Sequence, residues 1–155
     1  MKLANWSTAK VRNRRHLADR HRNRFLMSTS NTGASFGPRA RPIEVRYFSA
    51  DKRLEIEFDD GVRFSYPAEL LRVESPSAEV RGHGTDAKKI VAGRRHVGLI
   101  RIEPVGNYAI RPIFDDLHDT GLFSWAYLYE LGERQAEIWQ DYLDNLAANN
   151  LSRDP

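Results

Sequence analysis

The chain contains 155 residues, carries a formal net charge of +3 and has no cysteine. Without cysteine it cannot form a disulfide, a thiolate nucleophile, or a zinc or iron–sulfur site built on thiolates. No apolar run approaches the roughly 18 residues that a membrane-spanning helix needs, so the sequence predicts no such helix.

The charge is divided unevenly along the chain. Residues 1–41 have a net charge of +9, whereas residues 42–155 have a net charge of −6. The first region has few apolar residues and no steady period, so we expect a basic, disordered extension. Its arginines offer phosphate contacts, which makes nucleic-acid binding one alternative function. These arginines are Arg12, Arg14, Arg15, Arg20, Arg22 and Arg24.

Two interpretations of the first 26 residues bear on where the protein works. Arginine-rich, acid-poor N-termini are typical of organellar transit peptides, which would place the protein in an organelle matrix. Met27, followed by Ser-Thr-Ser, is also an ordinary beginning for a protein. We expect Met27 to be the native start and the protein to be cytoplasmic.

The next region begins with a pattern that alternates between apolar and charged residues. This period of two predicts strands over residues 43–48, 53–58 and 62–66, with Asp59-Asp60-Gly61 as a turn. Pro67 suits the start of a helix over residues 68–73, and a further short helix is expected between Ser75 and Gly82. Residues 82–96 are expected to form a loop.

The C-terminal half predicts two more strands and then helices. Residues 97–102 and 108–114 form the expected strand pair, and Pro112 indicates that the second strand lies at an edge or is bulged. After a loop over residues 115–121, Ser124 is expected to cap a helix over residues 125–131 that Gly132 ends. The last helix is predicted over about residues 133–149.

Strands first and helices last indicate an α+β domain over residues 42–149, followed by a tail over residues 150–155. We expect a small antiparallel or mixed β-sheet with short helices, and with the C-terminal helices packed on the sheet.

The densest group of ionisable residues lies in the loop after the second strand pair. Asp115, Asp116, His118 and Asp119 could bind a metal ion or place the histidine beside a carboxylate as a base. Aspartates also favour loops for reasons of backbone hydrogen bonding. The spacing matches no metal-binding motif, so both interpretations remain open at this point.

A second polar group spans residues 72–83 and includes Ser75, Ser77, Glu79 and His83. A serine beside a histidine supports nucleophilic catalysis only when a base, an orienting group and oxyanion donors converge. No Gly-x-Ser-x-Gly turn is present, so capping serines and surface charges explain this segment better.

Longer motifs identify the region by resemblance. They are Leu70–Gly84 (LLRVESPSAEVRGHG), Ile102–Ile110 (IEPVGNYAI), Phe114–Trp125 (FDDLHDTGLFSW) and Tyr127–Gly132 (YLYELG). Together they resemble the DUF971 family, the gamma-butyrobetaine hydroxylase-like N-terminal domain, over about residues 42–143. In dioxygenases of carnitine synthesis this domain precedes the catalytic domain, and in bacteria it also occurs alone.

The resemblance implies a zinc site that this sequence does not reproduce. The family's three cysteine ligands fall on Ser75, Ser77 and Val80, and only the histidine is retained, as His118. Serine is a poor zinc ligand and valine is none, so we expect hydrogen bonds such as His118 to Ser75 instead. Bacterial members usually have glycine where this chain has Leu117.

The expected function is a non-catalytic accessory module that binds a protein partner. The resemblance suggests an iron–sulfur or oxygenase partner, and the sequence has no facial triad of iron ligands. The alternatives are a zinc- or iron-binding protein that uses His118 and nearby aspartates, and nucleic-acid binding through the extension. We expect no cofactor. The expected interaction residues are Ser75, Ser77, Glu79, His83, Asp115, Asp116, His118 and Asp119.

Overall fold

The structure is a computed structural model that describes residues 41–77 and 89–155, together with the backbone of residues 22–26. These residues form two antiparallel sheets and three helices, which confirms the expected α+β class. No helix within the described ranges is long and apolar enough to cross a membrane.

The first sheet has four strands in the order β1-β2-β3-β4. Its last three strands, β2 (Pro42–Phe48), β3 (Arg53–Phe58) and β4 (Arg63–Pro67), form the predicted meander. In β3 the alternation is regular, because Leu54, Ile56 and Phe58 are buried and the residues between them are partly exposed. The apolar face therefore turns toward the core, as the period of two requires.

Strand β1 (Arg22–Leu26) was not expected. It pairs antiparallel with β2, with Arg22 opposite Phe48 and Leu26 opposite Glu44. The prediction of disorder across residues 1–41 is therefore wrong for these five residues. The free edge of β2 supplies backbone hydrogen-bond partners to any extended segment, whatever its side-chain pattern. Arg41 is also described, and the rest of the extension lies outside the described residues.

The second sheet has three strands in the order β5-β6-β7. They are β5 (Leu99–Val105), β6 (Ala109–Phe114) and β7 (Phe123–Ser124). The strand with Pro112 was expected to lie at an edge or to be bulged. It does not lie at an edge, because β6 is central, and its pairing with β5 has a register shift between Leu99 and Arg101. However, β7 pairs only with Ala109 and Ile110, so Pro112 has a neighbouring strand on one side alone.

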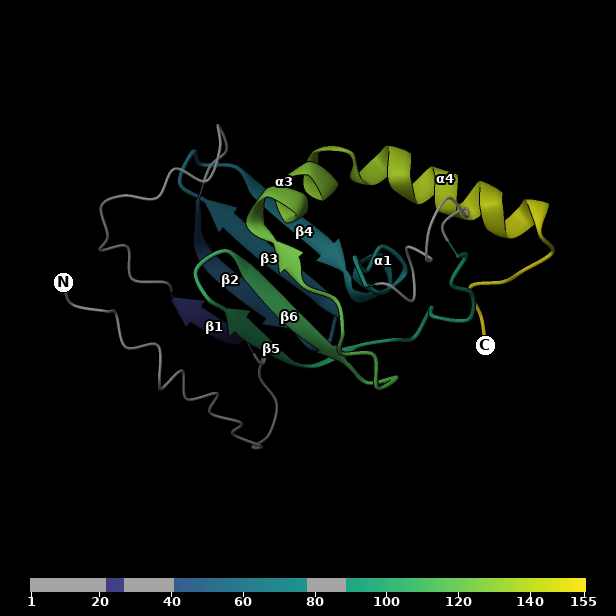
Figure 1. Ribbon diagram of the computed structural model, residues 1–155, viewed down its shortest axis with the longest axis horizontal. Coiled ribbons are helices and arrows are strands. Elements are labelled where there is room, and N and C mark those ends of the chain that lie inside the picture. The colour runs from purple at the N-terminus through teal and green to yellow at the C-terminus, as the bar shows by residue number, and fades with distance from the viewer. Residues whose placement is uncertain (1–21, 27–40, 78–88) are drawn as a thin grey trace.

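Three helices accompany the sheets in Figure 1: α1 (Ala68–Val73), α3 (Trp125–Glu133) and α4 (Gln135–Ala148). Ser124 caps α3, as predicted, because its Oγ accepts a hydrogen bond from the Tyr127 amide at 3.2 Å. Gly132 does not end α3 but lies inside it. A β-carbon at Gly132 would come within 2.3 Å of Phe64 Cγ, so the glycine permits close packing. Residues 75–77 are not helical, and the rest of the short helix expected there lies outside the described ranges.

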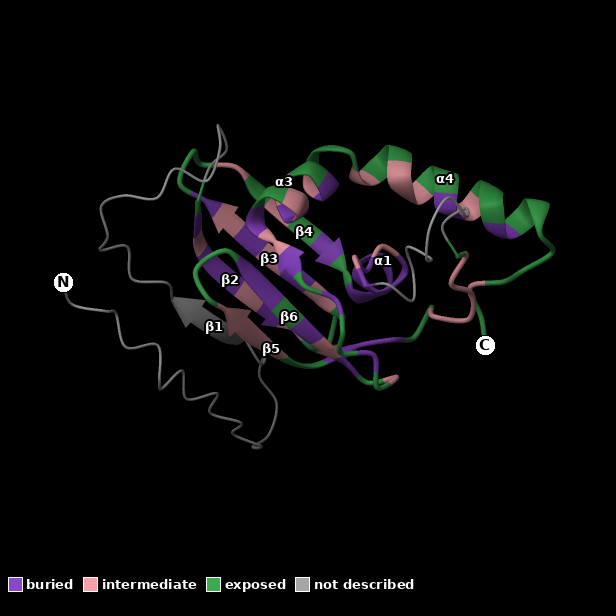
Figure 2. Cartoon of the chain, viewed as in Figure 1, coloured by how far each residue is buried: buried purple, intermediate pink, exposed green. Residues whose placement is uncertain are grey.

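One main core joins the two sheets and α3. Buried residues of the first sheet, such as Ile56 and Phe58, pack in one cluster with Ile110, Phe114 and Leu128. Figure 2 shows this interior along β2, β3 and β6, whereas most of α4 is exposed. A smaller cluster, formed by Val73, Tyr142 and Leu146, attaches α4 to α1.

Candidate functional site

The loop Asp115–Thr120, here called the site loop, follows β6 through a tight turn. The amide of Leu117 donates to the carbonyl of Phe114 at 3.2 Å, and the amide of Phe114 donates to the carbonyl of His118 at 3.0 Å. This turn holds Leu117 at φ 69°, in the left-handed region. That conformation costs about 1–2 kcal/mol for a residue with a β-carbon. Leu117 is also 84% exposed, the highest value among the exposed large hydrophobic residues described.

Asp115 fastens the start of the site loop to the residue before β5. Its Oδ2 accepts a hydrogen bond from the Gly98 amide at 3.0 Å, and its own amide donates to the Gly98 carbonyl at 3.0 Å. The next amide, that of Leu99, donates to the Tyr47 hydroxyl at 2.8 Å. Burial raises the pKa of Tyr47, this hydrogen bond lowers it, and the negative charge of Asp115 raises it further. The tyrosine therefore stays neutral.

Asp116 fixes the middle of the site loop through two guanidinium groups. Its Oδ2 lies 2.8 Å from Nε of Arg72 on α1 and 2.8 Å from Nε of Arg94. The Arg72 contact is an aligned hydrogen bond, whereas the Arg94 contact lacks that alignment and is electrostatic. Because Arg72 is buried, its charge needs this carboxylate.

His118 and Ser75 form a buried contact at the base of the site loop. The Ser75 Oγ lies 2.8 Å from His118 Nε2, and both residues are at most 5% exposed. The hydrogen bond expected between them is therefore confirmed. Gly121 makes room for it, because a β-carbon there would lie 2.2 Å from the Ser75 Oγ.

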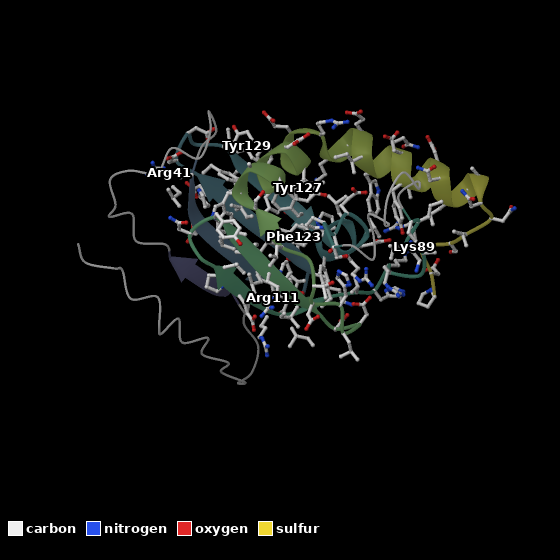
Figure 3. All side chains as sticks on the ribbon, in the orientation of Figure 1. Arg41, Lys89, Arg111, Phe123, Tyr127 and Tyr129 are labelled. Atoms are coloured by element: carbon white, nitrogen blue, oxygen red, sulfur yellow. The ribbon has the colours of Figure 1, made fainter. Side chains whose placement is uncertain are left out.

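The segment that carries Ser75 is held from the other side by α3. The Tyr127 hydroxyl donates to the Glu74 carbonyl at 2.6 Å. Its ring centroid lies 5.9 Å from that of Phe123, and Figure 3 labels both side chains, which lie near each other. Ser75 is thereby fixed between α3 and the site loop.

The chemistry of these residues does not fit the zinc that the resemblance implies. Ser75 and Ser77 supply hydroxyls instead of thiolates, and Ser75 already uses its oxygen on His118. Within the described ranges, no three His, Asp or Glu side chains gather as a metal-binding group. The Ser77 Oγ is buried and has no hydrogen-bond partner in the described part of the chain.

The same geometry gives no support to a serine nucleophile. Ser75 is 1% exposed, so a substrate cannot reach its Oγ. The hydrogen bond between Ser75 and His118 joins two segments inside the fold and is not accessible to solvent.

A polar depression of about 240 Å³ marks the outer face of the site loop. The residues lining it are Arg72, Asp116, Leu117, His118, Asp119 and Thr120. Asp119 is exposed, whereas Asp116 is occupied by its arginines and Asp115 accepts a hydrogen bond from Gly98. The surface therefore combines the exposed apolar side chain of Leu117 with the exposed carboxylate of Asp119.

The remaining predicted site residues are not brought into this group by the described chain. Glu79, Val80 and His83 lie outside the described ranges, as do Arg12, Arg14, Arg15 and Arg20. Arg22 and Arg24 lie on β1, of which only the backbone is described.

Three residues of the site were not among those predicted. Arg72 and Arg94 could not be assigned to Asp116, because the pairing joins segments far apart in the sequence. Leu117 did carry a signal, since it occupies a position where the resemblance leads one to expect glycine. The left-handed backbone of Leu117 explains why glycine is expected at this position, because glycine adopts that conformation without strain and leucine does not.

The comparisons with known proteins agree with this architecture. The profile of the family described as "Gamma-butyrobetaine hydroxylase-like, N-terminal" matches residues 45–129. That profile describes an N-terminal region and not a catalytic domain. No curated protein matches the chain.

Three solved structures are similar to this chain. One solution NMR structure is 46% identical in sequence and has a TM-score of 0.66. The match covers 75% of this chain and 91% of the chain in that structure. A second is 42% identical, with 80% and 92% covered and a TM-score of 0.67. A crystal structure of a protein of unknown function from the DUF971 family of Acidithiobacillus ferrooxidans is 36% identical, with 62% and 97% covered and a TM-score of 0.52. The chain therefore belongs to the gamma-butyrobetaine hydroxylase-like N-terminal family, also called DUF971.

Proposed function

We propose that this chain is a non-catalytic accessory module that binds a partner protein through the site loop. The observation that carries the proposal is Leu117, which combines a left-handed backbone with an almost fully exposed apolar side chain. Each feature costs free energy in the isolated chain, and burial of the side chain against a partner recovers part of that cost.

The rigidity of the site loop supports the same proposal. Asp115, Asp116 and His118 each attach the loop to a different part of the fold, at Gly98, at Arg72 and at Ser75. A loop held at three points loses little conformational entropy when a partner binds it, which favours affinity. Leu117 lies between these attachments and does not take part in them.

The family resemblance motivates a proposal for the class of partner. Its description places the domain at the N-terminus of gamma-butyrobetaine hydroxylase-like proteins. By that analogy we propose an oxygenase or an iron–sulfur protein as the partner, bound by noncovalent contacts. Metal binding and nucleic-acid binding gain no support from the residues described.

Site-specific photo-crosslinking in the native cell tests the proposal. A photoreactive phenylalanine analogue replaces Leu117 in one variant and Glu137 in another. Glu137 is the matched control, because it is exposed on α4, away from the site loop. We expect a discrete protein adduct from position 117 that is not formed from position 137. The adduct should be lost when the exposed Asp119 is changed to lysine.

Absence of an adduct from position 117, or the same adducts from both positions, would contradict the proposal. Circular dichroism of each variant checks that the fold is kept. The captured protein is then produced separately, and its binding to the wild-type chain and to Leu117→Asp is measured by calorimetry. Equal affinity of the two chains would also contradict the proposal.

A further inference from the structure

Residues Leu151–Pro155, here called the C-terminal segment, lie against the segment Gly93–Arg95. The Gly93 amide donates to the Ser152 carbonyl at 2.9 Å, and the Arg95 amide donates to the Arg153 carbonyl at 2.9 Å. Figure 1 shows the chain returning from the end of α4 to this position. The C-terminal segment, which bends at Arg153, is thus held by two backbone hydrogen bonds to Gly93 and Arg95.

One side chain of the C-terminal segment enters a site built by two helices. The Arg153 guanidinium donates to both carboxylate oxygens of Glu69, from Nε at 2.9 Å and from an Nη at 2.6 Å. It also lies over the Trp139 ring, 4.9 Å from the ring centroid. Glu69 comes from α1 and Trp139 from α4. A carboxylate that accepts two hydrogen bonds from one guanidinium, together with an aromatic ring that packs against the guanidinium plane, recognises arginine specifically.

The two sides of this contact differ in how they meet solvent. Glu69 is 5% exposed, so its carboxylate requires a cation, whereas the Arg153 side chain is 31% exposed. The neighbouring ion pair between Arg95 and Asp154 is about half exposed on both sides and therefore adds little. The carboxylate of Glu69 is therefore part of the buried face of α1, whereas the Arg153 guanidinium comes from a segment that is accessible to solvent.

We propose that Glu69 and Trp139 form a guanidinium site that accepts an arginine from a peptide segment. In this chain its own Arg153 occupies the site, and an arginine-bearing segment of a partner protein can displace the C-terminal segment. This site is separate from the site loop, and the inference does not depend on Leu117.

The test uses the full chain with Arg153→Ala, which empties the site. The probe is a synthetic peptide with the sequence of residues 150–155, Asn-Leu-Ser-Arg-Asp-Pro, and the readout is the NMR signal of the Trp139 indole. We expect a saturable shift of this signal. A matched peptide with alanine in place of arginine should bind about tenfold more weakly or worse, because a charge-assisted double hydrogen bond is lost.

Two further chains complete the design. The wild-type chain should bind the arginine peptide more weakly than Arg153→Ala does, because its own tethered arginine competes at high effective concentration. The double variant Arg153→Ala with Glu69→Gln should not distinguish the two peptides. If Arg153→Ala does not fold alone, the titration is repeated with Arg153→Lys, which keeps a cation without the planar fork.

The proposal is overturned if no saturable shift occurs, if both peptides bind the emptied chain equally, or if the wild-type chain binds as tightly as the variant. A destabilised Arg153→Ala chain that ignores the peptide would show that the ion pair only fastens the chain end.

Discussion

Replacement of Ser75 by alanine is the sharpest test of how the site loop is held. The change removes the 2.8 Å hydrogen bond to His118 Nε2. Ser75 is 1% exposed and His118 is 5% exposed, so water cannot readily take the place of the hydroxyl. A buried polar group left without its partner costs about 1–3 kcal/mol. We expect the free energy of unfolding to fall by about that amount.

Urea denaturation followed by circular dichroism measures the loss, and the slope of the transition should not change. The midpoint temperature should fall by roughly 2–4 °C for each kcal/mol in a chain of this size. Ser49→Ala is the matched control, because Ser49 is exposed in a turn, and it should change stability by less than about 0.5 kcal/mol.

A double-mutant cycle with His118→Leu isolates the interaction from the other contacts of each residue. We expect a coupling free energy of about 1 kcal/mol between positions 75 and 118. A coupling near zero, or a Ser75→Ala chain as stable as the control, would refute the argument that this hydrogen bond fastens the site loop.

Three other variants test separate features. Leu117→Gly should raise the free energy of unfolding by about 0.5–1 kcal/mol in urea denaturation, because relief of the left-handed strain exceeds the added chain entropy. Gly132→Ala should lower it by about 1–3 kcal/mol, despite better helix propensity, because the new β-carbon would lie 2.3 Å from Phe64 Cγ. Burial, and then the charge of Glu69, raise the pKa of Tyr142 from 10.0 to about 12. The stability that the neutral Tyr142 hydroxyl contributes to the folded state is therefore complete below pH 10 and is lost as the pH rises through 12. Tyr142→Phe should therefore lose less stability than wild type between pH 9 and about 11.

Each of these expectations has a clear contrary result. A Leu117→Gly chain less stable than wild type would show that the exposed leucine has contacts within the fold. A stabilised Gly132→Ala chain would show that Phe64 moves aside without cost. An equal alkaline loss in wild type and Tyr142→Phe would assign that loss to other groups.

The local elements were the part of the fold that sequence patterns predicted best. Strand β3 and helix α1 have the expected bounds, because alternation in Leu54, Ile56 and Phe58 and the proline at position 67 act within a few residues. The helix that Ser124 caps also begins where expected, since a cap is likewise a local interaction.

Features set by distant residues were predicted less well. Gly132 was expected to end a helix, but its role depends on Phe64, which lies on another strand. The central position of β6 depends on the two residues of β7, which pair with Ala109 and Ile110. In the site loop, the contact of His118 with Ser75 came from the resemblance, whereas no local pattern pointed to the pairing of Asp116 with Arg72 and Arg94.

Strand β1 has a consequence for the two candidate start codons. A product that begins at Met27 would lack Arg22–Leu26, the strand that covers the outer edge of β2. The backbone amides and carbonyls along this edge of β2 would then be exposed and could pair edge to edge with another molecule. Choice of start site would thereby set the solubility and self-association of the protein, and not only the charge of its N-terminus.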